Sequence, residues 1–123
     1  MKVSIDVSSE TVYNLLSCAF EGGVGYWCRL DNYTLNDERV YGYEHLADPD
    51  GDACWVISEI DEWEADDSKW DTHTVTYEKL LEGLHVMAAK YPWHFANIFN
   101  GNMDSTTGDV FLQCSLLGDI VYG

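Results

Sequence analysis

Residues 71–91, DTHTVTYEKLLEGLHVMAAKY, contain the change of period that decides the fold. Threonine and valine dominate residues 71–77, as is typical of a strand. The apolar residues that follow recur at helical intervals and form one stripe of an amphipathic helix: Leu80, Leu84, Met87, Ala88 and Tyr91. The sequence therefore predicts a strand that runs directly into a helix.

The N-terminal segment predicts a second strand and helix pair. Apolar and polar residues alternate over residues 3–7, which indicates a short strand. Ser8 and Ser9 offer an N-cap for a helix over residues 9–20 with one buried face. The glycines within residues 22–25 are expected to end that helix in left-handed geometry.

The middle of the chain predicts an antiparallel sheet. Residues 26–30, YWCRL, are rich in strand formers. A hairpin is expected over residues 39–63, with apolar arms at 40–46 and 54–60. Between the arms lies DPDGD, residues 48–52, whose proline and glycine suit a tight turn.

The C-terminal part predicts helices. Pro92 would end the helix of the opening stretch and begin another, and Thr106 with Asp109 resembles a capping box for a third. That third helix, residues 110–117, is apolar on most sides and should be central. The predicted fold class is α+β in one domain over residues 1–123. It has an N-terminal strand and helix, an antiparallel sheet with a central hairpin, and C-terminal helices packed on the sheet.

The net charge excludes several functions. The chain has 22 Asp and Glu against six Lys and Arg, a formal charge of −16 and a pI near 4.1. Such a chain repels phosphate, so direct nucleic-acid binding and peripheral binding to an anionic membrane are not expected. The 46% content of hydrophobic residues argues against disorder.

The sequence also bears on compartment and cofactors. No signal peptide, transit peptide or membrane span is expected, and the four cysteines have no CxxC spacing. The cysteines are interpreted as reduced core thiols in a cytosolic protein. No metal or other cofactor is expected. The oligomeric state, monomer or dimer, stays open.

Acidic residues concentrate in one part of the chain. Between Glu44 and Asp71 there are eleven carboxylates and one lysine, and six of the nine residues from 59 to 67 are acidic. Placed on strands and turns, alternate carboxylates would lie about 7 Å apart on one face, which could imitate part of a nucleic-acid backbone. The alternative is a solvated face that only keeps the protein soluble.

Two tryptophans interrupt this acidic run. Trp63 and Trp70 are candidate interface anchors ringed by charge, although either could instead face inward from a strand. The complete set of candidate partner-binding residues is Asp48, Asp50, Asp52, Glu59, Asp61, Glu62, Trp63, Glu64, Asp66, Asp67 and Trp70.

Other chemistries are less well supported by the sequence. Asp48, Asp50, Asp52 and Glu59 match positions of a calcium-binding EF-hand loop, but Ala53 replaces its glycine. The four histidines lack metal-binding pairing and no catalytic residue is predicted, so an enzyme is not expected, although an acid/base hydrolase with converging His and acid groups stays open.

Segments at both ends of the chain resemble a known family. AFEGG at residues 19–23 with YW at 26–27, and DVFLQ at 109–113 with GDIVYG at 118–123, are similar to blocks in small proteins of bacteriophages and mobile elements. LLEGL at residues 80–84, leading to KYP at 90–92, fits the same pattern. The acidic middle is not matched, and no catalytic residue carries over.

The resemblance implies a phage-borne accessory gene, and inhibitors of host defence are frequent among small acidic phage proteins. Together with the charge, it favours an anti-CRISPR or anti-restriction inhibitor that occupies the basic groove of a host nuclease complex as an acidic nucleic-acid mimic. Its partner would be a basic nucleic-acid-binding host protein. The alternative is a protein that sequesters a nucleotide signal, with the turn at Glu21 and an aromatic pocket near Trp27 as its binding site.

Overall fold

The switch from strand to helix lies at Thr76. Its backbone is extended and its hydroxyl accepts a hydrogen bond from the backbone N–H of Lys79, which caps the helix that follows. Strand β4, Thr72–Val75, precedes this residue and helix α2, Tyr77–Lys90, begins directly after it. The opening stretch therefore folds as predicted.

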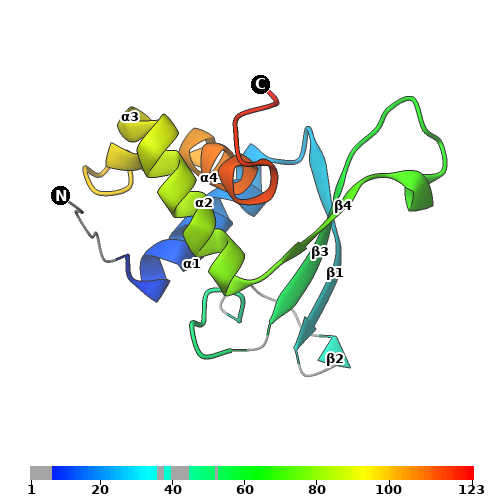
Figure 1. Cartoon of the computed structure of the whole chain (residues 1–123), viewed down its shortest axis with the longest axis horizontal. Coiled ribbons are helices and arrows are strands. Elements are labelled where there is room, and N and C mark those ends of the chain that lie inside the picture. The colour runs from blue at the N-terminus through cyan, green and yellow to red at the C-terminus, as the bar shows by residue number, and fades with distance from the viewer. Residues whose placement is uncertain (1–6, 36–37, 40–44, 52) are drawn as a thin grey trace.

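A computed structural model describes residues 7–35, 38–39, 45–51 and 53–123 (Figure 1). Besides β4 and α2, its elements are α1 Ser9–Cys18, the π-helical turn η1 Ala19–Gly23, β1 Cys28–Leu35, β2 Glu38–Arg39, β3 Cys54–Glu59, the 3-10 turn η2 Asp67–Lys69, α3 Pro92–Ala96 and α4 Ser105–Leu117. Helices and an antiparallel sheet are separate along much of the chain, so the fold class is α+β, as predicted.

The sheet has the strand order β2-β1-β3-β4, and all neighbours are antiparallel. Leu30 of β1 lies opposite Ile57 of β3, and the register shifts between Leu30 and Asn32. Trp55 and Ile57 of β3 are buried, so alternate residues of this strand face the helices. The helices gather on one side of the sheet (Figure 1).

The second arm of the predicted central hairpin, residues 54–60, corresponds to strand β3. The arm at residues 40–46 lies mostly outside the described residues, and β3 pairs with β1 on one edge and β4 on the other. The hairpin that contains β3 is therefore β3–β4, with the acidic segment as its connection. The predicted strand at residues 3–7 falls largely outside the described residues, and Val7 is not in a strand.

Helix α4 is central, as predicted from its apolar sequence. Nine of its residues are buried, and α1, η1 and α2 pack around it. Gly83 of α2 permits the close approach of the two helices, because a Cβ there would lie 1.9 Å from the Ser115 hydroxyl and 2.6 Å from its Cα. No helix among the described residues combines the length and the apolar content that a membrane span requires.

Two predicted helix ends differ from the structure. The capping box of α4 is formed by Asp104 and Thr107, because the helix begins at Ser105 and Thr106 already lies inside it. Helix α1 does not end in left-handed geometry: the chain continues through η1, and Val24 ends it at φ −111°. Gly23 is required for packing instead, since a Cβ there would lie 2.4 Å from the backbone oxygen of Ser105.

Candidate functional site: the acidic loop

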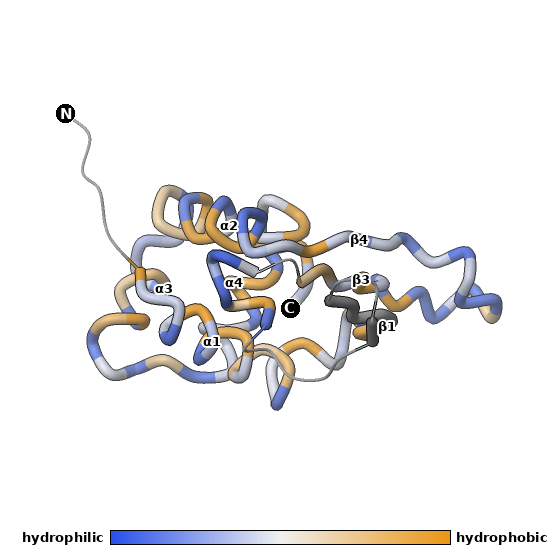
Figure 2. Tube along the Cα trace, turned by 90° about the horizontal axis from the view of Figure 1, so that it is seen from below, coloured by the Kyte–Doolittle hydropathy of each residue, from blue (hydrophilic) through white to orange (hydrophobic). Residues whose placement is uncertain are grey.

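The connection between β3 and β4, residues 60–71, is here called the acidic loop. It contains six carboxylates and one lysine. It extends beyond the sheet on the side away from α3 (Figure 1), and hydrophilic residues dominate it (Figure 2). A loop that projects from a rigid sheet is a typical position for binding residues.

Several of the acids shape the loop itself. Asp61 accepts a hydrogen bond from the backbone N–H of Trp63 at 3.0 Å, and Glu64 accepts one from the N–H of Asp66 at 3.0 Å. Asp66 caps the turn η2 by accepting from both the N–H and the hydroxyl of Ser68. Short side-chain bonds of this kind fix turn geometry, so these carboxylates have a structural role besides any contact with a partner.

A contact with β1 anchors the far side of the loop. The Arg29 guanidinium lies 3.1 Å from the Asp67 carboxylate and 4.9 Å from the centre of the Trp70 ring. The Trp70 indole N–H donates to the backbone oxygen of Glu64 at 3.0 Å. Trp70 is therefore a half-buried internal anchor of the loop, held by its hydrogen bond to Glu64 and its cation–π contact with Arg29.

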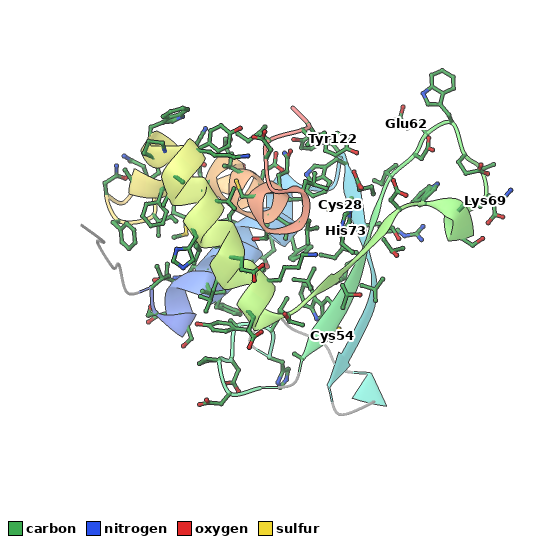
Figure 3. The ribbon with its side chains drawn as sticks, in the orientation of Figure 1. Cys28, Cys54, Glu62, Lys69, His73 and Tyr122 are labelled. Atoms are coloured by element: carbon green, nitrogen blue, oxygen red, sulfur yellow. The ribbon has the colours of Figure 1, made fainter. Side chains whose placement is uncertain are left out.

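Trp63 and Glu62 have a different environment. The Trp63 side chain is 97% exposed, and the carboxylate of its neighbour Glu62 makes no hydrogen bond or ion pair with any described residue. Glu62 and Lys69 lie on the loop, well away from the helices (Figure 3). The sequence allowed Trp63 either to be exposed or to face inward from a strand, and in the structure it is exposed.

The base of the loop joins the sheet to the C-terminal segment. Tyr122 donates its hydroxyl hydrogen to Glu59 Oε1 at 2.5 Å, and His73 Nε2 lies 2.9 Å from Glu59 Oε2. Because an ionised carboxylate only accepts, the proton of this second bond belongs to His73. Glu59 is thus the middle member of a chain of three side chains, largely shielded from solvent.

The pKa values at the base follow from these bonds. Burial raises the pKa of Glu59, but the hydrogen bonds from Tyr122 and His73 outweigh it and hold that pKa below 4.5. The bond to Glu59, with burial, raises the pKa of Tyr122 to about 12. The pKa of Glu59 is lowered and that of Tyr122 is raised, so both lie further from pH 7. This favours a structural role for the pair of side chains over general acid–base chemistry.

A second network holds the C-terminal segment against α4. Gln113, which is 1% exposed, accepts through Oε1 from the backbone N–H groups of Val121 and Tyr122 at 2.8 and 2.9 Å. Its amide nitrogen donates to Asp109 Oδ1 at 3.0 Å and to the Tyr122 carbonyl oxygen at 3.2 Å. Gln113 therefore satisfies the backbone of a segment that forms no regular structure of its own.

Asp109 links this network to the turn before β1. It accepts from the Tyr26 hydroxyl at 2.5 Å and from the Trp27 indole N–H at 2.8 Å. Burial and the bond to Asp109 raise the pKa of Tyr26 to about 12. The ring of Trp27 also stacks on Tyr122 at 5.3 Å, so the residues of the two terminal sequence blocks meet in one place.

A cavity of about 410 Å³ lies at the base of the acidic loop and is here called the loop cavity. Its walls are formed by Glu59, Ile60, Asp61, Glu62, Trp63, Lys69, Trp70, Asp71 and Tyr122. Figure 3 places Tyr122 and His73 near the end of the sheet from which the loop extends. The cavity combines aromatic rings with carboxylates.

The structure separates the predicted contact residues into groups. Asp61, Glu62, Trp63, Glu64, Asp66, Asp67 and Trp70 all belong to the acidic loop. Asp48 and Asp50 lie in a turn before β3, at its other end and roughly 20 Å away by strand length. Asp52 lies outside the described residues. Glu59 points inward and bonds to Tyr122 and His73.

The described acids do not form a regular series along a strand face. Glu59 is the only predicted contact residue inside a described strand, and its carboxylate is occupied. The other predicted contact residues that the structure describes lie on turns and in the acidic loop, where their intervals follow loop geometry and not the strand rise. Apart from Glu59, the described acids therefore lie in two separate places, the acidic loop and the turn before β3.

The alternative binding site was predicted as an aromatic pocket near Trp27. The Trp27 side chain is 1% exposed and stacks on Tyr122, and it does not line the loop cavity or the cavities beside Glu21 and Tyr13. Glu21 and Gly22 do border a cavity of about 540 Å³ with Ser17 and Met103, but without an aromatic wall.

Metal and thiol chemistry have little support in the described part of the chain. Within residues 7–35, 38–39, 45–51 and 53–123, no three His, Cys, Asp or Glu side chains are grouped to hold a metal ion. All four cysteines are free thiols, and burial raises the pKa of Cys28 to about 12 and that of Cys114 to about 11. These two thiols stay protonated and unreactive at neutral pH.

Sequence reasoning missed the residues that support the loop. Arg29, His73 and Tyr122 were not predicted as parts of the site, and their contacts with the acidic segment span 38, 14 and 63 positions. One signal was present: Tyr26, Trp27, Asp109 and Gln113 fall in the two terminal blocks that the sequence singled out.

No family model, curated protein or solved structure matched the chain.

Proposed function

We propose that the protein binds an electropositive protein partner through the acidic loop. The partner would be a nucleic-acid-binding subunit of a host nuclease complex, and the loop would occupy the groove that normally holds phosphates. On this proposal the protein is a phage-encoded inhibitor of host defence, of the anti-CRISPR or anti-restriction kind, that acts in the bacterial cytoplasm.

The observation that carries the proposal is the exposure of Trp63, which lies between Glu62 and Glu64 on the acidic loop. Burying a tryptophan contributes strongly to folding, so an indole that is 97% exposed on a projecting loop leaves a large apolar surface in water. Tryptophan is also enriched at the energetic centres of protein interfaces. A solubilising face would need the charges but not this side chain.

The charge supplies the partner class. The acidic loop has a net charge of −5, from six carboxylates and one lysine, within a chain of −16. Its field would attract a basic surface and repel nucleic acid itself. Association through such a loop should be fast at low salt and weaken steeply as salt is added.

The test is affinity capture from a host lysate at low and high salt. The wild-type protein is compared with Glu62→Lys/Trp63→Ala, because neither of these two side chains bonds to a described residue and the loop should keep its shape. The matched control is Glu78→Lys on the exposed side of α2, which changes the net charge by the same amount as the loop variant. A basic nuclease subunit retained at low salt by wild type and control, but not by the loop variant, supports the proposal.

Two results would count against it. The first is retention of the same basic subunit by the loop variant, which would remove the acidic loop from the interface. The second is the absence of any retained basic protein at low salt, which would leave the loop as a solvated face.

A further inference from the structure

The loop cavity has walls of two chemical kinds. The residues that line it include three aromatics, Trp63, Trp70 and Tyr122, together with four acidic residues and one lysine. Its volume of about 410 Å³ falls within the range of roughly 300–1,000 Å³ found for ligand pockets. Aromatic faces and carboxylates both attract cations, so the two kinds of wall favour the same ligand class.

The carboxylates in the wall differ in availability. Glu59 already accepts from Tyr122 and His73, and Asp61 accepts from the N–H of Trp63 through one oxygen. The side chains of Glu62 and Asp71 are exposed and form no hydrogen bond with a described residue. Glu62, Asp71 and the second oxygen of Asp61 can therefore accept from a ligand.

The protein already recognises one guanidinium group beside this cavity. Arg29 lies over the Trp70 ring at 4.9 Å and pairs with Asp67 at 3.1 Å, and neither Arg29 nor Asp67 lines the cavity. The loop thus combines an indole face and a carboxylate around an arginine that comes from β1. The residues that line the loop cavity repeat this combination of indole and carboxylate.

We propose that the loop cavity binds the guanidinium group of an arginine side chain from the partner protein. This inference rests on the proposed function and names the group that the acidic loop would recognise. A guanidinium is planar and can stack on an indole while it donates to a carboxylate, whereas an ammonium is a compact and strongly hydrated charge. Arginine is therefore preferred over lysine.

Lys69 gives the proposal a distinctive consequence. It is the one basic residue in the wall of the cavity, where it opposes a second cation. Replacing it with glutamine removes that repulsion, so Lys69→Gln should bind an arginine ligand more tightly than wild type.

The experiment is a titration of the intact protein with the peptide acetyl-Gly-Arg-Gly-amide at low salt. Parallel titrations use the lysine peptide and the neutral citrulline peptide, which has nearly the shape of arginine. The readout is the NMR signal of the indole N–H groups of Trp63 and Trp70, assigned with Trp63→Phe and Trp70→Phe. The expected affinity for the arginine peptide is on the order of tenfold higher than for the citrulline peptide.

Variants locate the site. Glu62→Gln/Asp71→Asn should lose this preference, whereas Glu78→Gln/Glu82→Gln, with the same charge change on exposed positions of α2, should keep it. Equal affinity for the arginine and lysine peptides, or equal loss in both variants, would overturn the guanidinium site. Salt-dependent capture of a basic partner without a response to the arginine peptide would overturn this inference and leave the proposed function intact.

Discussion

The hydroxyl of Tyr122 donates to the carboxylate of Glu59 at 2.5 Å, across 63 positions of sequence. This bond ties the C-terminal segment to the end of β3, at the point where the acidic loop begins. It also closes one wall of the loop cavity. The support of the loop therefore depends on a segment that the sequence places far from it.

Loss of this bond should lower stability. We expect Tyr122→Phe to reduce the free energy of unfolding by about 1–2 kcal/mol, the usual value for a hydrogen bond to a charged group that is partly shielded. Urea denaturation measures this change. A double-mutant cycle with Glu59→Gln isolates the pair, and additive effects of the two substitutions would show that the bond contributes nothing.

Glu59 should also make stability depend on acid pH. Its pKa is lowered in the folded protein, so the stabilisation is fully present above the unfolded pKa and is lost as the pH falls through about 4.5 and below. We expect the free energy of unfolding of wild type to fall more steeply between about pH 5 and pH 3 than that of Glu59→Gln. Parallel slopes in acid denaturation would contradict the pKa shift.

The contact between α2 and α4 should be sensitive to a single methyl group. In Gly83→Ala the new Cβ would collide with the backbone and side chain of Ser115, and overpacking of this kind costs about 1–3 kcal/mol. Gly25→Ala is the matched control, because a Cβ at Gly25 meets nothing within 4 Å. Equal melting temperatures for the two variants would show that the helices do not approach so closely.

The two tryptophans of the acidic loop should separate binding from stability. Trp63→Ala removes an exposed side chain and should leave the melting temperature unchanged while weakening partner binding by about 2 kcal/mol, as for an interface anchor. Trp70→Ala removes the contacts with Arg29 and Glu64, so it should lower the stability of the loop as well. Hydrogen exchange of residues 60–71 measures this second effect.

The elements with local signals could be predicted from the sequence. The N-cap at Ser8, the passage from strand to helix at Thr76 and the buried helix around Phe111 all depend on residues within a few positions of each other. Strand pairing depends on distant residues, and no local pattern shows that Leu30 lies opposite Ile57. The first arm of the predicted hairpin, residues 40–46, lies mostly outside the described residues, and β3 pairs with β1 and β4.

In the candidate site, too, local properties could be predicted and contacts between distant residues could not. The charge of the acidic segment is a property of composition, so it can be read from the sequence without the fold. The direction of each side chain depends on the fold: Glu59 points inward because Tyr122 and His73 meet it there, and Trp63 is exposed because the chain turns away from the sheet after Ile60. Residue type alone distinguishes neither case.

Competition with nucleic acid tests the central claim most directly. A fluorescent DNA duplex is bound to the captured nuclease subunit and then titrated with wild type, Glu62→Lys/Trp63→Ala or the α2 variant Glu78→Lys. If the acidic loop occupies the phosphate groove, wild type and the α2 variant displace the duplex and the loop variant does not. Displacement by all three proteins alike, or a ternary complex that contains both DNA and wild type, would contradict the account.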